Sequence, residues 1–225
     1  MLKELYFTSD KIDEVSNRIY LNAVRYSENR PLVFKKEGTG LLIVDMQDYF
    51  LSPDSHAFIP SSPTVMDRII EFKEICQNHG MPVFFTRHIN TQKNAKMLGK
   101  WWKDLITATQ PYNEICSELD TSGCEIITKT QYDAFFKTNL EASLKKMKIE
   151  TLIVTGVMTN LCCETTVRSA FVRGIQPLLP IDLTAAYSEF LHMSSVVNLS
   201  YGFTVPSLSG QIIEKIEKRM TREKG

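Results

Sequence analysis

Short apolar segments alternate with amphipathic segments along most of this chain. The apolar segments have the β-branched content of buried strands and lie at residues 41–44, 83–86, 125–128, 152–155, 178–181 and 203–205. The amphipathic segments have apolar positions at helical spacing and lie at residues 65–78, 140–148, 162–173, 189–199 and 211–220. Such alternation predicts parallel strands joined by right-handed crossovers, and therefore a three-layer α/β fold with a doubly wound, mainly parallel sheet.

The N-terminal segment does not follow this alternation. Residues 11–25 have apolar positions at helical spacing, and residues 27–40 have the proline and glycines of a connecting loop. We therefore predict a helical arm over residues 1–38 that lies outside the core, and a domain over residues 39–225 that carries the chemistry. With 43% hydrophobic and 23% charged residues, the composition is that of an ordinary globular protein.

Charge and hydropathy limit the partners that we expect. Lysine plus arginine balances aspartate plus glutamate at 26 each, which argues against nucleic acid as a partner. No apolar run reaches the length of a membrane span, and acidic residues stand near the N-terminus where a signal peptide has its apolar core. We expect a cytoplasmic protein with no membrane partner and a small-molecule substrate.

The cysteines and histidines do not have the spacing of a metal site. Five cysteines include no CxxC pair, and four histidines include no HxH or HExxH pair. The odd number of cysteines also argues against a disulfide framework. We expect reduced cysteines, no metal and no cofactor.

The segment TLIVTGVMTNLCCETTVRSAF, residues 151–171, combines a strand pattern with a helix pattern and places a cysteine where they join. Gly156 is expected to end the strand, and Thr159 and Asn160 stand where they could cap the first helical turn. Cys162 would then face free backbone N–H groups and the positive end of the helix dipole, which favour the thiolate. Cys162 is therefore a candidate nucleophile.

Two further chemical groups follow predicted strands. Asp45 follows the first strand and Lys129 the third. In a doubly wound sheet, ligands bind beyond the carboxyl ends of the strands, so Asp45, Lys129 and Cys162 would share one rim. Each residue alone has an ordinary interpretation: a loop-capping aspartate, a solvated lysine or a core cysteine. Together they suggest a cysteine site in which a carboxylate accepts the thiol proton.

From Gly40 onward the chain resembles the isochorismatase-like hydrolases, also called cysteine hydrolases. The segments LLIVDMQDYF, KTQYDAFFKTNL and GVMTNLCCETTVRSAF carry the resemblance, in the family's order and spacing. The resemblance implies an Asp-Lys-Cys catalytic triad in which Asp45 is the general acid/base, Lys129 the cationic partner and Cys162 the nucleophile. Cys163 stands where the family commonly has an apolar residue, and we interpret it as a packing residue.

The resemblance also implies a cis peptide bond between Val157 and Met158, and an oxyanion hole formed by the backbone N–H groups of Met158 and Cys162. The activity that it implies is metal-independent hydrolysis of a C–N bond, in an amide, carbamoyl or ureide group, through a thioester.

Two other branches of the family and a catalytically silent relative are the alternatives. True isochorismatases, which cleave an enol ether to release 2,3-dihydro-2,3-dihydroxybenzoate and pyruvate, resemble this chain in DMQDYF, MLGKWW and HMSSVVNLSYGF. They typically have glycine at the position of Cys162, glutamine at His88, an aromatic residue at Met158 and an arginine near Ala95 and Lys96. These four differences argue against isochorismate as the substrate. Nicotinamidases have an Asp-x-His metal motif where this chain reads RHINTQ, and this difference argues against that branch. The third alternative is an oligomeric or regulatory relative that uses the arm as an interface.

Four residues are candidates for substrate contacts. Arg87 and His88 follow the second predicted strand, Trp102 lies in a segment that covers the site in relatives, and Tyr132 closely follows Lys129. We favour Trp102 over its neighbour Trp101. Because oligomers are common among relatives, we also expect a homo-oligomer, a dimer or a tetramer.

Overall fold

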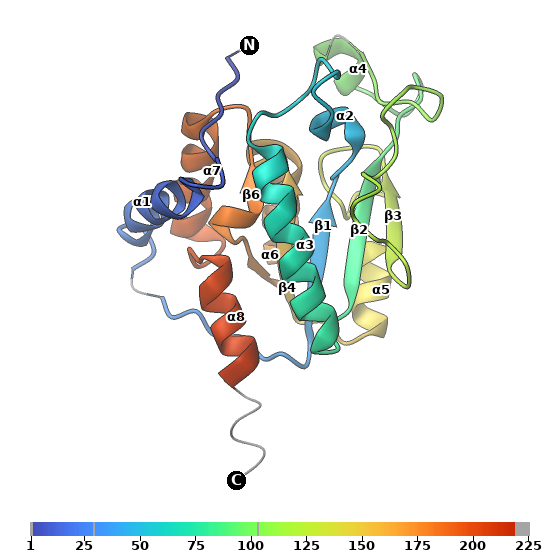
Figure 1. Ribbon diagram of the computed structural model, residues 1–225. Coiled ribbons are helices and arrows are strands. Elements are labelled where there is room, and N and C mark those ends of the chain that lie inside the picture. Colours follow the sequence, from blue (N-terminus) through green and yellow to red (C-terminus); the bar gives the residue numbers. More distant parts are fainter. Residues whose placement is uncertain (1, 29, 103, 219–225) are drawn as a thin grey trace.

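The computed structural model describes residues 2–28, 30–102 and 104–218, and its centre is a parallel sheet (Figure 1). The sheet order is β3-β2-β1-β4-β5, and β6 pairs with the end of β4. All five pairings are parallel. The strands are β1 Thr39–Val44, β2 Val83–His88, β3 Glu125–Lys129, β4 Thr151–Val157, β5 Gln176–Leu178 and β6 Thr184–Ala185. The predicted α/β fold with a doubly wound sheet is confirmed.

Helices cover both faces of this sheet. In Figure 1, α3 and α8 lie in front of the sheet, and α5 and α6 lie behind it. The longer helices are α1 Ile12–Val24, α3 Ser62–Asn78, α5 Leu140–Lys146, α6 Glu164–Val172, α7 Glu189–Gly202 and α8 Ser209–Lys218. Two single-turn helices, α2 Asp48–Leu51 and α4 Leu98–Trp101, follow β1 and β2. The apolar side chains of the central strand β1 are fully buried between the two layers.

The prediction of a strand at residues 203–205 is wrong. Phe203 caps the C-terminal end of α7, and its ring packs edge-on against Phe171 with centroids 5.3 Å apart. Thr204 donates a side-chain hydrogen bond of 2.7 Å to the carbonyl oxygen of Pro177. The strand predicted at residues 178–181 is also misplaced, because β5 spans Gln176–Leu178 and Pro180 forms only an isolated bridge, with Ser207. The strand that instead completes the sheet, β6, is only two residues long.

Gly156 does not end β4, as we predicted, but lies inside it, because the strand continues to Val157. Its backbone has a φ of +103°, in the region that side chains disfavour. A Cβ atom at this position would lie 2.2 Å from the carbonyl oxygen of Val44 on β1. Glycine therefore permits the close approach of β1 and β4 immediately before the ends that carry the candidate site.

The helical arm has α1 where the spacing predicts it, but the expectation that the arm lies outside the core is wrong. Its apolar side chains belong to the same buried cluster as those of β1. Phe7, Ile12, Ile19 and Ala23 are at most 1% exposed. The domain boundary at residue 38 remains a prediction. Among the described residues, no helix has the length and hydropathy needed to cross a membrane.

Candidate active site

The ends of β1, β3 and β4 bring Asp45, Lys129 and Cys162 together. Lys129 Nζ lies 2.7 Å from Asp45 Oδ2, and both side chains are 0% exposed. The same ammonium group donates a hydrogen bond of 3.3 Å to the sulfur of Cys162. A further hydrogen bond of 3.0 Å to the carbonyl oxygen of Gln131 holds the lysine in place. The structure therefore brings the three candidate residues together, with the ammonium group of Lys129 in contact with both Asp45 and Cys162.

The surroundings of Asp45 favour its ionised form. Its Oδ1 accepts a hydrogen bond of 2.6 Å from the hydroxyl group of Thr86, which in turn accepts one of 3.0 Å from the Asp45 backbone N–H. Burial by itself would raise the pKa of Asp45, but the charge of Lys129, together with side-chain hydrogen bonds from Cys162 and Lys129, outweighs burial and lowers it. Burial likewise opposes the charge of Lys129, yet Asp45 and Cys162 raise the lysine pKa. A buried carboxylate–ammonium pair results.

Cys162 rests as a thiol, which corrects the expectation that its position favours the thiolate. Burial raises the pKa of this thiol, and the nearby Lys129 opposes that rise only in part. Cys162 lies in a π-helical turn, Thr159–Cys163, and the α-helix begins only at Glu164. The thiol therefore needs a base to ionise it, and Asp45 is the buried carboxylate whose oxygen lies within 4.8 Å of its sulfur.

Thr159 does not cap the helix, contrary to our prediction, and neither the π-turn nor α6 has a side-chain cap. The hydroxyl group of Thr159 instead lies 2.8 Å from Nδ1 of His192, on α7. Burial lowers the pKa of His192 to about 3, so this histidine is neutral. The side chain of Thr159 thus links the π-turn that carries Cys162 to α7.

Two expectations for the residues around the thiol are confirmed. The peptide bond between Val157 and Met158 is cis. Cys163 is fully buried in the core cluster and is absent from the pocket lining, as expected for a packing residue.

His88 contacts Lys129 directly. Its Nδ1 lies 3.3 Å from Lys129 Nζ, and its Nε2 lies 2.7 Å from Oδ1 of Asn90. Burial, assisted by the charge of Lys129, lowers the pKa of His88 to about 4. The neutral ring therefore accepts a hydrogen bond from Lys129 at Nδ1 and donates one to Asn90 from Nε2.

Asp45, His88 and Cys162 are also the one group of potential metal ligands among the described residues, with ligand atoms within 4.8 Å of one another. The ammonium group of Lys129, however, already contacts all three side chains. A metal ion at the same place would be repelled by that charge at close range. The side chains of Asp45, His88 and Cys162 therefore fit an ammonium group better than a metal ion.

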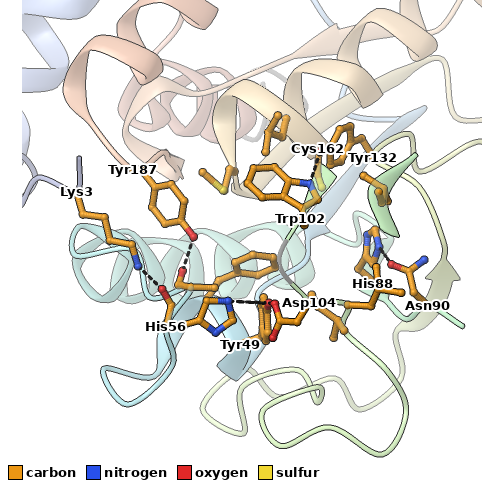
Figure 2. Close-up of a pocket in the computed structure, with 17 residues that line it drawn as sticks. Lys3, Tyr49, His56, His88, Asn90, Trp102, Asp104, Tyr132, Cys162 and Tyr187 are labelled. Carbon is orange, nitrogen blue, oxygen red and sulfur yellow. Dashed lines mark hydrogen bonds and ion pairs between the residues drawn. The ribbon is translucent and has the colours of Figure 1, made fainter. Parts of the chain in front are cut away.

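A cavity of about 260 Å³ opens beside Cys162 (Figure 2). Its walls are mainly apolar and aromatic. Trp102 and Tyr132 both line it, and the indole N–H of Trp102 donates a hydrogen bond of 2.7 Å to the Tyr132 hydroxyl group. Trp101 is 74% exposed and does not line the cavity. The predicted preference for Trp102 over Trp101 therefore agrees with the structure, and His88 also lines this cavity.

Arg87 does not reach this cavity, contrary to our prediction. Its guanidinium group donates hydrogen bonds of 2.6 Å to Asn113 and 2.7 Å to Glu114, and it lines a separate hollow. Successive side chains of a strand point to opposite faces, so Arg87 and His88 cannot both face the same cavity from β2.

Several lining residues were not predicted from the sequence. Tyr49 follows Asp45 by four residues, a spacing that fits either the core or the pocket wall. Phe50, Leu98 and Leu161 lie in segments that carry the family resemblance, but nothing in those segments distinguishes a core residue from a pocket residue. The others come from segments without such a motif, namely Lys3, His56, Ala57, Asn90, Asp104, Leu105, Ile106 and Tyr187.

Comparison with known proteins agrees with this geometry. Residues 39–210 match the family model described as the isochorismatase domain. The chain is 38% identical to nicotinamidase 3 of Arabidopsis thaliana over 168 residues, which cover 72% of this chain and 81% of the relative. It is 30% identical to enterobactin synthase component B of Escherichia coli, covering 72% of this chain but only 58% of that relative. A cysteine hydrolase from Pseudomonas syringae has the same fold, with a TM-score of 0.77, 24% identity and coverage of 84% of this chain and 99% of that one.

The relatives' names cover several hydrolytic activities. They include an N-carbamoylsarcosine amidase from Arthrobacter and an isochorismatase from Bacillus subtilis. A single substrate therefore does not follow from similarity. The extent of the family match and the 38% identical relative establish that the chain belongs to the isochorismatase family of hydrolases.

Proposed function

We propose that this chain is a metal-independent cysteine hydrolase that cleaves a C–N bond of a small molecule, in an amide, carbamoyl or ureide group. The observation that carries the proposal is the contact of one ammonium group, that of Lys129, with both Asp45 (2.7 Å) and Cys162 (3.3 Å). This geometry joins a buried base to a thiol that lines a cavity.

The first half of the reaction forms an acyl-enzyme. Asp45 accepts the proton of Cys162 as the sulfur attacks the carbonyl carbon, and Lys129 stabilises the thiolate as it develops. The backbone N–H groups of Met158 and Cys162 stabilise the tetrahedral oxyanion. When the C–N bond breaks, Asp45 returns the proton to the departing ammonia or amine, and the acyl group remains on sulfur.

The second half releases the product. A water molecule attacks the acyl carbon while Asp45 accepts one of its protons, and the C–S bond then breaks. The sulfur recovers this proton from Asp45, and the carboxylic or carbamic acid leaves the pocket. Because Asp45 and Lys129 regain their charges, no other group is needed to complete the cycle.

Cleavage of a C–N bond is preferred over cleavage of an enol ether because the chain has a nucleophile. Protonating an enol ether requires an acid and no thiol. In this chain a thiol lies against the buried ion pair and lines the cavity. The names of relatives such as nicotinamidase 3 and N-carbamoylsarcosine amidase support hydrolysis of an amide or a carbamoyl group.

Ammonia release from a panel of compounds tests the proposal. The panel contains nicotinamide, N-carbamoyl amino acids, ureidoacrylate and simple aliphatic amides, each assayed with EDTA-treated protein. We expect release from at least one compound, and we expect EDTA to leave the rate unchanged. Release of pyruvate from isochorismate, with no ammonia from any compound, would support the enol-ether alternative instead.

A further inference from the structure

The N-terminal arm contributes a charged residue to the cavity that contains Cys162. The ammonium group of Lys3 donates a hydrogen bond of 2.6 Å to the carbonyl oxygen of His56 and lies 4.7 Å from the centre of the Tyr187 ring. Lys3, His56 and Tyr187 all line the cavity. Figure 2 shows these three side chains together on one side of it, away from His88.

The arm holds Lys3 at this place through backbone hydrogen bonds on the residues that follow it. The N–H group of Glu4 donates to the carbonyl oxygen of Tyr187 at 2.8 Å. The N–H group of Tyr6 donates to the hydroxyl group of Ser61 at 3.1 Å. These contacts anchor Lys3 beside the cavity.

The charges around the cavity leave Lys3 without an acidic partner. It is the only lysine or arginine among the described residues that line the cavity, and Asp104 is the only acid. Asp104 is already engaged, because it accepts hydrogen bonds of 2.8 Å from Tyr49 and 3.1 Å from Gln110. No carboxylate among the described residues forms an ion pair with Lys3, and partial burial lowers the lysine pKa. An anionic ligand would replace the water that a partly buried ammonium group loses.

We propose that Lys3 binds a carboxylate group of the substrate, and that the substrates are small amides or N-carbamoyl compounds with a carboxylate remote from the scissile bond. This inference rests on the proposed function, because it assumes that the C–N bond lies at Cys162. Apart from Lys3 and Cys162, the cavity wall is mainly apolar, which suits a short hydrocarbon linker between the carboxylate and the scissile C–N bond. The family match begins at residue 39, so Lys3 is a specificity residue contributed from outside the matched domain.

Binding measurements on the Cys162→Ser variant test this proposal without turnover. The probes are N-carbamoyl amino acids with linkers of increasing length, each paired with its neutral methyl ester, and the readout is the dissociation constant from calorimetry. We expect at least one acid to bind about tenfold or more tightly than its ester, the size of effect typical of a charge-assisted hydrogen bond. Lys3→Met should remove this preference, and Lys3→Arg should keep most of it.

Lys11→Met is the matched control, because Lys11 is an exposed lysine on the same arm. It should leave the preference for the acid unchanged. The proposal is overturned if no acid binds more tightly than its ester, or if Lys3→Met weakens the acid and the ester equally, as loss of a purely structural contact would. Failure of the ammonia assay together with a Lys3-dependent preference would instead reject the proposed reaction and leave anion binding standing.

Discussion

Replacing Cys162 with serine is expected to lower the rate of ammonia release by at least about 10⁴-fold, because the attacking atom is lost. A serine hydroxyl group is a much weaker acid than a thiol, and Asp45 is too weak a base to ionise it. The substitution is nearly isosteric at a site that is 6% exposed, so the fold should persist. The rate of ammonia release and the melting temperature, measured on the same sample, separate loss of chemistry from loss of structure.

Cys163→Ser is the matched control for this prediction. Cys163 is the next residue and is fully buried, but it does not line the cavity. We expect it to lose some stability and to keep a rate within a few-fold of the unaltered protein. If Cys162→Ala kept full activity while Asp45→Ala did not, the thiol would not be the nucleophile, and an acid-dependent enol-ether reaction would be the better account.

Replacing Lys129 with methionine is expected to abolish hydrolysis and to reduce the free energy of unfolding by about 3–5 kcal/mol, the cost of breaking a buried ion pair. The loss follows because Asp45 would remain at 0% exposure without its cation. Burial would then dominate and raise the pKa of Asp45. The carboxyl group would already carry a proton and could no longer accept the thiol proton. Chemical denaturation measures the first effect and the ammonia assay the second.

The double variant Asp45→Asn/Lys129→Met serves as the control. With neither charge present, most of the stability should return while activity stays absent. Unchanged stability of Lys129→Met would contradict this account of the Asp45–Lys129 ion pair. So would a double variant that is less stable than Lys129→Met.

The pH dependence of the Lys129→Met deficit follows from the directions of the pKa shifts. In the unaltered protein the pKa of Asp45 lies below its ordinary 3.8, so the stability it contributes is complete above 3.8 and is lost as pH falls through the lowered value. The pKa of Lys129 lies above 10.5, so its contribution is complete below 10.5. In the Lys129→Met variant the pKa of Asp45 is raised in the folded state, so the free energy of unfolding falls as pH rises above 3.8. The deficit should therefore shrink as pH is lowered toward 3.8.

The sequence was sufficient to place the triad because its three residues lie at or beyond the carboxyl ends of predicted strands. Strands β1 and β4 are both buried along their whole length, and each contains a run of three or four apolar residues. Their ends could therefore be located from the sequence. In a parallel sheet those ends share one edge. Asp45, Lys129 and Cys162 could then be placed together without knowledge of any contact.

The ionisation of the thiol could not be predicted, because it depends on competing effects that spacing does not show. Position at a helix start favours the thiolate, whereas burial of Cys162 favours the thiol, and burial dominates. The position of the Arg87 side chain could not be predicted either, because the sequence does not show which face of β2 lies toward the cavity. Lys3 was missed for a different reason: it reaches the cavity only because the arm folds back across the domain, a long-range contact with no local pattern.

The most direct test of the central claim is a search for the acyl group on sulfur. The best substrate from the panel is mixed with the protein, the reaction is quenched in acid during turnover, and the peptide that contains Cys162 is examined by mass spectrometry. We predict that this peptide gains the mass of the substrate's acyl or carbamoyl group, and that Cys163 carries none. An unmodified Cys162 throughout active turnover, together with an active Cys162→Ala variant, would contradict the account.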